Sequence, residues 1–555
     1  MGDGDGFGRL DRRAVMAGLG AAGAVLAPAV LSGPATAQGM AREGVVETTA
    51  GRVRGTYADG AYGFICVPYG ASTAGPGRFL PPRRPEPWTG VREAPAQRII
   101  APQTNPKIPP PPPGSLFSII RESNAEESED CLNVCIWTPA LDRGRRPVMV
   151  WLHGGGYASG SGSNPSYYGG KLASSRDVVV VNVTHRLNVL GHTYLGDLLG
   201  PRFATSGNAG VLDMAAALTW VSENIERFGG DPRTVMIFGE SGGGGKVASL
   251  MAMPRAKGLF HRAAMESGSV KTLSERPEAT QAAQALLAEL GLGARQAVDL
   301  QAVPLGRLMD AYFAVSARLG GGLGPFGPVR DGVSILQHPF DPVANPMSAE
   351  VPLLIGTNET EVTLFSLGDE ALFHLDDGGL AARMADTLGK RNGAAAVALY
   401  RELYPRASAS DLYFIMSTDR SAGFRRGAIQ IAELKAAQGG APAHLYELLW
   451  RTPVMDGRLR SPHGLEISLV FNNPDAPSTA PITGGGPRAL AMAEVVSAAW
   501  TSFARTGDPS TARLAWPAYD LERRTTMLFN ETSGAEPDPF RRTRMFWDGL
   551  ANAFM

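Results

Sequence analysis

The sequence has few cysteines, since only Cys66, Cys131 and Cys135 occur among its 555 residues. Cys131 and Cys135 lie in one strand-like run, roughly 13 Å apart at the rise of a strand, which is too far for a disulfide. Neither a zinc-binding spacing nor a C-x-x-C redox pair is present. We therefore expect three small buried side chains, one possible Cys66–Cys131 bridge and no metal site.

The sequence also lacks an excess of charge of either sign. Its 52 Lys and Arg residues and 53 Asp and Glu residues give a formal net charge of −1. This balance argues against a nucleic acid or an anionic membrane as partner. With 44% hydrophobic and 19% charged residues, the composition excludes a disordered chain and a multi-span membrane protein. A chain of this length can bury a large core without metals or disulfides.

The first 37 residues have the composition of an export signal rather than of a folded domain. Arg12 and Arg13 precede an uncharged stretch over 14–37, and Ala35-Thr36-Ala37 fits a small-x-small cleavage site. This pattern resembles a bacterial twin-arginine signal. A buried or membrane-anchoring helix is the alternative, but the stretch is rich in Ala and Gly. We expect an exported protein, periplasmic or extracellular, with one domain over 38–555 and no stable membrane insertion after cleavage.

Apolar, β-branched runs alternate with helical patterns along the rest of the chain. Within each run, apolar residues occupy consecutive positions instead of every second position, which predicts strands buried on both faces. The expected strands cover 147–152, 178–183, 234–238, 352–355 and 443–450, and clear helical stretches cover 214–227, 275–290 and 489–505. The order predicts an α/β fold with a mostly parallel sheet and helices on both faces. Ligands of such sheets bind at the carboxyl ends of the strands.

Three segments interrupt this alternation. Residues 101–127 contain five consecutive prolines, 109–113, and predict a stiff surface loop over a site. Residues 270–345 and 365–440 predict mainly helical insertions.

Gly239-Glu240-Ser241-Gly242-Gly243 follows a predicted buried strand and opens a predicted helix. G-x-S-x-G in this context is typical of a nucleophile elbow, in which a serine occupies a strained strand-to-helix turn. In a glycine-rich chain the motif alone is weak evidence for a nucleophile, but its position directly after a predicted strand makes the evidence specific. The alternative is a structural glycine turn.

His153-Gly154-Gly155-Gly156-Tyr157 also follows a predicted strand. Consecutive glycines free backbone N–H groups to point at one oxygen, as a tetrahedral oxyanion requires. We assign the oxyanion hole to Gly155 and Gly156, with the N–H of Gly242. A phosphate-binding loop is the alternative, but no Lys-Ser/Thr pair follows the glycines.

A serine nucleophile needs a base and an acid that orients it. Of eight histidines, His463 is the best candidate base, because it lies in a polar loop after the last long strand and the expected chain order is serine, acid, histidine. Glu359 and Glu361 both follow a predicted strand between Ser241 and His463. The sequence pattern alone leaves the choice between them open.

These residues resemble those of the type-B carboxylesterase family, which includes the cholinesterases, and the bacterial branch in particular. The resemblance covers about residues 44–548. It is carried by SEDCL from Ser128, HGGGY, the segment from Gly207 through FGESGG, PFGPVRDG, GTNETE, HGLEISLVF and WTSFARTGDPS. It implies the α/β-hydrolase fold with helical insertions over the site.

The resemblance also implies roles for single residues. Glu361 occupies the family's acid position, which makes Glu359 a surface neighbour. Glu240 and Ser267 would line the site, and Tyr157 would border the acyl pocket. The family's buried ion pair would be formed by Glu129 and Arg186.

This sequence departs from the family's pattern at three positions. Val362 and Gly242 replace a usual Gly and a usual Ala, and Ala101 stands where the family has the cysteine that pairs with Cys131.

The sequence thus predicts a serine hydrolase that cleaves small carboxylic esters through a Ser241–His463–Glu361 triad and an acyl-enzyme, without metal or organic cofactor. Leu116, Phe117 and Ile119 near the expected mouth favour a moderately apolar acyl or aromatic ester. Two alternatives are a lipase acting on longer chains and a non-catalytic binding protein of the same fold. Nothing in the sequence indicates an oligomeric state.

Overall fold

A large twisted sheet forms the centre of the molecule. The computed structural model describes residues 44–94, 98–108, 116, 125–320 and 324–553. Within these residues the sheet has 13 strands. In spatial order they are β1 (Gly44–Glu47), β2 (Arg52–Ala58), β3 (Ala61–Pro68), β7 (Asn133–Thr138), β9 (Val179–Thr184), β8 (Arg146–Leu152), β10 (Gly230–Glu240), β11 (Arg262–Glu266), β14 (Leu353–Asn358), β15 (Ala443–Leu448), β16 (Thr525–Phe529) and β17 (Gly534–Pro537), with β4 (Val91–Glu93) beside β2. Short two-stranded pairs join β5 (Ile99–Ile100) to β6 (Glu126–Glu127) and β12 (Ser274–Glu275) to β13 (Val329–Arg330).

The middle of the sheet is parallel, and its margins are antiparallel, with β16 against β17 at one of them, except that the short β4 pairs in parallel with β2. Every pair from β9 through β8, β10, β11, β14 and β15 to β16 is parallel, whereas β1, β2, β3 and β7 pair in antiparallel fashion. Every residue of β9 (VVVNVT), β14 and β15 is buried, as continuous apolar runs predict. The expected strands are confirmed, and β10 extends beyond the predicted 234–238 at both ends.

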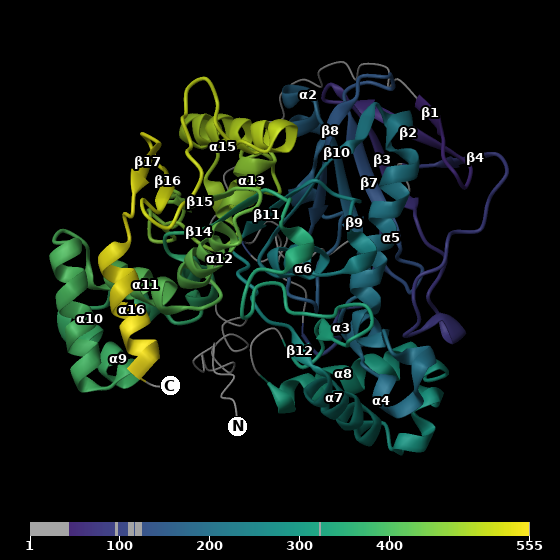
Figure 1. Cartoon of the computed structure of the whole chain (residues 1–555), viewed down its shortest axis with the longest axis horizontal. Coiled ribbons are helices and arrows are strands. Elements are labelled where there is room, and N and C mark those ends of the chain that lie inside the picture. The colour runs from purple at the N-terminus through teal and green to yellow at the C-terminus, as the bar shows by residue number, and fades with distance from the viewer. Residues whose placement is uncertain (1–43, 95–97, 109–115, 117–124, 321–323, 554–555) are drawn as a thin grey trace, which may run out of the picture.

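Helices cover both faces of the sheet (Figure 1). They are α2 (Gly170–Arg176), α3 (Asn188–His192), α4 (Gly196–Leu199), α5 (Ala209–Asn224), α6 (Gly242–Met251), α7 (Arg276–Glu289), α8 (Leu305–Leu319), α9 (Asp377–Leu388), α10 (Lys390–Leu403), α11 (Ala409–Arg420), α12 (Arg425–Ala437), α13 (Leu465–Val470), α14 (Ala480–Thr483), α15 (Gly486–Thr506) and α16 (Arg541–Ala553). The predicted helices over 214–227, 275–290 and 489–505 correspond to α5, α7 and α15, so the predicted α/β fold is confirmed.

The predicted helical insertions form two groups at opposite sides of the molecule. Helices α4, α7 and α8 gather on one side, and α9, α10, α11 and α16 gather on the other (Figure 1). The first group has its own apolar core around Leu286 and Leu308, and the second has one around Leu380 and Trp547. The proline run 109–113 and the export signal lie outside the described residues.

The predicted ion pair between Glu129 and Arg186 is wrong. Glu129 pairs with Arg78 through two 2.6 Å contacts, and Arg186 pairs with Asp213 of α5. Both arginines are buried, and each meets its carboxylate side-on with two N–H groups, which the linear sequence cannot specify. Cys131 is fully buried outside any disulfide, so the possible bridge to Cys66 is not formed.

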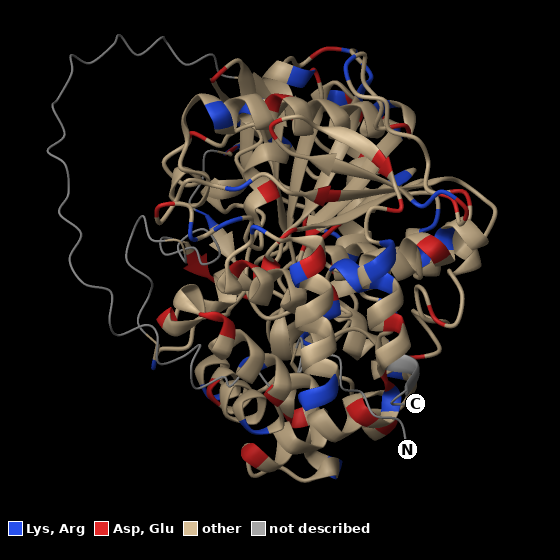
Figure 2. Cartoon of the chain, turned by 90° about the vertical axis from the view of Figure 1, so that its left-hand side faces the viewer, with Lys and Arg blue, Asp and Glu red and all other residues tan. Residues whose placement is uncertain are grey.

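Charged residues of both signs are interspersed along the ribbon rather than grouped by sign (Figure 2). Among the helices of the described ranges, none combines the length and apolarity that a membrane crossing requires.

Candidate active site

Ser241 stands at the turn between β10 and α6, near the middle of the sheet. Its φ of 58° and ψ of −121° lie outside the regions that L-residues favour, and its N–H donates to the carbonyl of Glu266 at 2.8 Å. Strained backbone of this kind persists where the surroundings hold it in place, and it concentrates at functional sites. The structure thus has the strand–turn–helix geometry that the G-x-S-x-G motif predicts.

Helix α6 begins with four glycines because its first turn packs directly on other backbone. A Cβ on Gly242 would overlap the backbone of Gly156, and a Cβ on Gly243 would overlap the carbonyl of Leu152. Tertiary packing therefore overrides the low helix propensity of glycine here. The contact also brings the start of α6 against the glycine loop after β8.

Three backbone N–H groups are available beside Ser241. Gly155 and Gly156 have φ values of 79° and 64°, and no described residue accepts a hydrogen bond from their N–H groups. Gly242 is the first residue of α6, so its N–H has no acceptor within the helix. These are the three residues that the sequence assigns to an oxyanion hole, and the structure brings them together.

His463 and Glu361 are hydrogen-bonded to each other. The Nδ1–H of His463 donates to Oε2 of Glu361 at 2.7 Å, and the N–H of Asn358 donates to Oε1 of Glu361, also at 2.7 Å. Glu361 is fully buried and His463 is 6% exposed. This arrangement fixes the imidazole with Nδ1 protonated, which leaves Nε2 as the basic atom.

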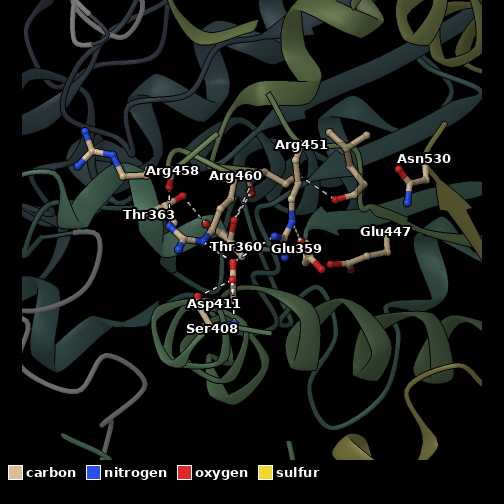
Figure 3. Close-up of polar contacts among 12 residues, drawn as sticks. Glu359, Thr360, Thr363, Ser408, Asp411, Glu447, Arg451, Arg458, Arg460 and Asn530 are labelled. Carbon is tan, nitrogen blue, oxygen red and sulfur yellow. Dashed lines mark hydrogen bonds and ion pairs between the residues drawn. The ribbon is translucent and has the colours of Figure 1, made fainter. Parts of the chain in front are cut away.

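Glu359, the alternative acid, points elsewhere. Its Oε2 accepts a hydrogen bond from Nε of Arg451 at 2.8 Å, and Arg451 also contacts Asp411 of α11 (Figure 3). Thr360 and Ser461 join the two loops that carry Glu361 and His463 through three hydrogen bonds of 3.0–3.1 Å. The structure therefore separates two glutamates that the sequence pattern could not separate.

Glu240 is the second carboxylate at His463. Its Oε1 lies 3.1 Å from Nε2 of His463. No hydrogen bond between Ser241 and His463 is recorded among the described residues, and such bonds often tighten only when substrate is bound. Burial raises the pKa of Glu240 to about 8, against the opposing effect of His463. Burial alone would lower the pKa of His463, but Glu240 and Glu361 raise it to about 9.

Two further buried glutamates complete an acidic cluster, which consists of Glu240, Glu266, Glu361 and Glu466. Glu466 accepts hydrogen bonds from Ser267 and Asn358, and Glu266 accepts one from Nε1 of Trp500 at 2.6 Å. Burial raises the pKa of Glu466 to about 7 and that of Glu266 well above its ordinary range. Neither residue was predicted from the sequence, although an acid within the apolar run of α13 was a signal for Glu466.

Aromatic rings surround the imidazole of His463. Phe365 and Phe424 lie 4.9 Å and 5.4 Å from it, measured between ring centroids. Phe365 is 39% exposed, so it offers an apolar surface next to the reactive groups. Tyr157 is instead buried, with its ring against His192, and its contact with substrate stays a prediction.

The described residues contain no group of three or more His, Cys, Asp or Glu side chains that could hold a metal ion. The groups at Ser241 are a hydroxyl, an imidazole paired with a carboxylate, and backbone donors. Together these groups are suited to acyl transfer.

Comparisons with known proteins point to one family. The sequence model of the Carboxylesterase family matches residues 42–547. A para-nitrobenzyl esterase of Bacillus subtilis (strain 168) is 35% identical over 497 residues, which cover 89% of this chain and 96% of the relative. A phenmedipham hydrolase of Pseudarthrobacter oxydans is 30% identical over 499 residues, 89% of this chain and 96% of the relative.

Solved structures give the same result. The carboxylesterase EST55 of Geobacillus stearothermophilus matches with a TM-score of 0.75 at 37% identity, over 91% of this chain and 99% of that one. An esterase of Clostridium hathewayi, described as able to hydrolyse aliphatic aromatic polyesters, matches with a TM-score of 0.77 at 31% identity, over 92% of this chain and 100% of that one.

Proposed function

The chain belongs to the carboxylesterase family and hydrolyses carboxylic esters, and we propose that Ser241, His463 and Glu361 carry out this reaction. The observation that carries the assignment is the 2.7 Å hydrogen bond between His463 and Glu361, formed beside a serine in a strand-to-helix turn. Ser241 follows β10, Glu361 lies shortly after β14, and His463 lies in the loop between β15 and α13.

In the acylation step, Ser241 Oγ attacks the ester carbonyl carbon while Nε2 of His463 takes the hydroxyl proton. Glu361 holds the imidazole and stabilises its charged form. The N–H groups of Gly155, Gly156 and Gly242 bind the oxygen that becomes negative. His463 then gives the proton to the leaving alcohol, and the acyl group stays on Ser241.

In the deacylation step, water repeats the attack with His463 again acting as base, and the carboxylic acid leaves. General base catalysis contributes about 10²–10⁴ in rate, and each oxyanion donor contributes about 10²–10³. These contributions come from groups of this chain alone.

For the substrate, we propose esters with a moderately apolar or aromatic group on one side of the ester bond. The half-exposed ring of Phe365 next to His463 supports this proposal, because it favours an apolar neighbour for the scissile bond. The para-nitrobenzyl esterase among the relatives is named for an aromatic ester.

The direct test is reaction of the purified protein with a fluorophosphonate probe, followed by intact mass and peptide mapping. The same sample is then assayed on p-nitrophenyl esters of graded chain length. We expect labelling at Ser241, with loss of activity proportional to the label. A folded sample that stays unlabelled would contradict the triad, and a sharp rise in activity above substrate solubility would indicate a lipase.

For the location, we propose export through the twin-arginine signal. Arg12 and Arg13, the uncharged stretch after them and the match to the family from residue 42 onward support this proposal. In a bacterium with twin-arginine export, changing both Arg12 and Arg13 to Lys should retain the full-length protein in the cytoplasm. The Arg9→Lys variant should still be cleaved and exported, and equal export of both variants would contradict the proposal.

A further inference from the structure

Helix α6 carries a fully buried lysine in its second turn, five residues after Ser241. The amine of Lys246 donates a hydrogen bond to the carbonyl of His153 at 2.7 Å. It also lies 3.5 Å from the carbonyl of Gly154 and 3.4 Å from Nδ1 of His153. All of these contacts are with the residues that open the glycine loop.

The surroundings of Lys246 contain imidazoles instead of carboxylates. The rings of His153 and His185 stack with centroids 5.0 Å apart, and His192 lies beyond them against Tyr157. No described Asp or Glu forms an ion pair with Lys246. We call Lys246 and these three imidazoles the basic cluster, which consists of His153, His185, His192 and Lys246, all buried.

Each imidazole of the basic cluster is fixed to the backbone. Nδ1 of His153, His185 and His192 lies 2.8–3.1 Å from the carbonyls of Gly154, Arg186 and Gly207 respectively. Nδ1 therefore carries the proton in each case, and burial keeps all three rings neutral by lowering their pKa. Burial also lowers the pKa of Lys246 well below its ordinary value.

A buried amine without a carboxylate partner costs folding free energy that an apolar side chain of similar length would not cost. The fold does not need Lys246 to close the core at this point, because α6 already packs on β8 through its glycines. All of its hydrogen bonds are with one segment, through the carbonyls of His153 and Gly154, which lie immediately before Gly155 in the chain.

Those two carbonyls belong to the peptide units that also contain the N–H groups of Gly154 and Gly155. A peptide unit is planar, so fixing the carbonyl of Gly154 fixes the N–H of Gly155 on its opposite side. The same helix supplies the third donor, the N–H of Gly242, at its first residue. Lys246 thus links the two segments whose relative position defines the oxyanion hole.

We propose that Lys246 is a positioning residue of the oxyanion hole: its amine holds the carbonyls of His153 and Gly154, which directs the N–H of Gly155 at the carbonyl oxygen of the substrate and fixes the start of the loop that continues to Gly156. This inference rests on the proposed function, because it needs an oxyanion at that place. Lys246 does not touch substrate and acts only through the loop.

The test compares Lys246→Met, which keeps the length and removes the donor, with the wild-type enzyme. We expect kcat to fall about 10- to 100-fold, less than the loss of a whole oxyanion donor, with KM changed less than threefold. A trifluoromethyl ketone, which forms a tetrahedral adduct with Ser241, should bind more weakly by the same factor as kcat/KM. A ground-state ligand, the product alcohol, should bind as before.

Lys435 provides a matched control, because it is also buried and its amine donates to two backbone carbonyls, those of Ser348 and Ala349, each at 2.8 Å. These carbonyls precede β14, whereas Glu361 follows that strand. The Lys435→Met variant should lose thermal stability and keep its kcat and its affinity for the ketone. If Lys246→Met behaves in the same way, the proposal is overturned.

Lys246→Gln, which keeps a shorter donor, serves as the conservative variant and as the replacement if Lys246→Met does not fold. We expect its kcat and its ketone affinity to lie between those of the wild type and Lys246→Met. If Lys246→Met does not fold, we expect Lys246→Gln to lose affinity for the ketone and to keep its affinity for the alcohol. Equal losses for both ligands would overturn the proposal. Labelling of Ser241 by the fluorophosphonate in the wild type shows separately that the proposed function holds.

Discussion

The acidic cluster and the basic cluster lie on opposite sides of one short segment, and they differ in what their polar groups do. Gly154 separates them: a Cβ on it would lie 2.9 Å from Oε2 of Glu240, while its carbonyl lies 3.5 Å from the amine of Lys246. On the acidic side, carboxylates surround a histidine and shift its pKa. On the basic side, every imidazole has one nitrogen fixed by a carbonyl. We infer that the acidic cluster takes part in proton transfer and that the basic cluster keeps the backbone of the glycine loop in position.

The largest expected effect on kcat comes from replacing Ser241, because both the acidic cluster and the basic cluster act on the reaction at this residue. Ser241→Ala should lower kcat by about 10⁴- to 10⁶-fold, because neither the base nor the oxyanion hole has a nucleophile to act on. Thermal unfolding and circular dichroism should match those of the wild type. Substantial residual turnover by a homogeneous sample would show that another group is the nucleophile.

The second test separates the two glutamates of the acid loop. Glu361→Gln should lower kcat by about 10⁴-fold, since the imidazole loses the partner that fixes its tautomer. Glu359→Gln, which alters only the contact with Arg451, should stay within about threefold of the wild type in kcat/KM. Greater damage from Glu359→Gln would move the acid to that residue.

A third test bears on the geometry of the oxyanion hole. Gly243→Ala adds a Cβ that overlaps the carbonyl of Leu152 and approaches that of His153, so the loop or the start of α6 must move and kcat should fall about 10- to 100-fold. Gly306→Ala in α8 is the control, because a Cβ there meets no atom within 4 Å. If both variants have wild-type kcat, the close approach of the loop to α6 is not needed for catalysis.

The fourth test sharpens the acidic side through its pH dependence. The base must be neutral, so kcat/KM should rise with pH as His463 loses its proton, over a range above its ordinary value of 6.5. Glu240→Gln removes a negative partner, lowers the pKa of His463 and should move the rising limb to lower pH. Glu359→Gln should not shift the rising part of the pH profile of kcat/KM. If Glu240→Gln does not shift it either, the proposed effect of Glu240 on His463 is contradicted.

The smallest effect concerns stability. Burial raises the pKa of Glu466 from 4.5 to about 7, so the folded state binds this proton more tightly than the unfolded state does. Its stabilising contribution is complete below about pH 4.5 and is lost as pH rises through about 7. Glu466→Gln lacks this loss, so its Tm minus that of the wild type should increase over this range. A constant difference would contradict the shift.

The sequence was sufficient for the parts of the site that depend on position along the chain. A strand that ends in GESGG predicts the elbow at Ser241, and a strand that ends in HGGGY predicts free N–H groups at Gly155 and Gly156, because both follow from strand ends and glycines. The helical insertions were predicted for the same reason, since their periodicity is local.

The parts that depend on side-chain direction were not predictable in this way. Glu359 and Glu361 stand two residues apart, and only the folded loop shows that one turns to Arg451 and the other to His463. The pairing of Glu129 with Arg78 instead of Arg186 is of the same kind. Lys246 gave no signal, because a lysine in a helix is normally exposed.

The most direct test of the account is a crystal structure of the enzyme after reaction with a phosphonate that forms a tetrahedral adduct. The account predicts phosphorus bonded to Ser241 Oγ, with one phosphoryl oxygen about 2.7–3.1 Å from the nitrogens of Gly155, Gly156 and Gly242. It also predicts that Lys246 keeps its hydrogen bond to the His153 carbonyl. An adduct on another residue, or a phosphoryl oxygen that faces solvent instead of the three N–H groups, would contradict it.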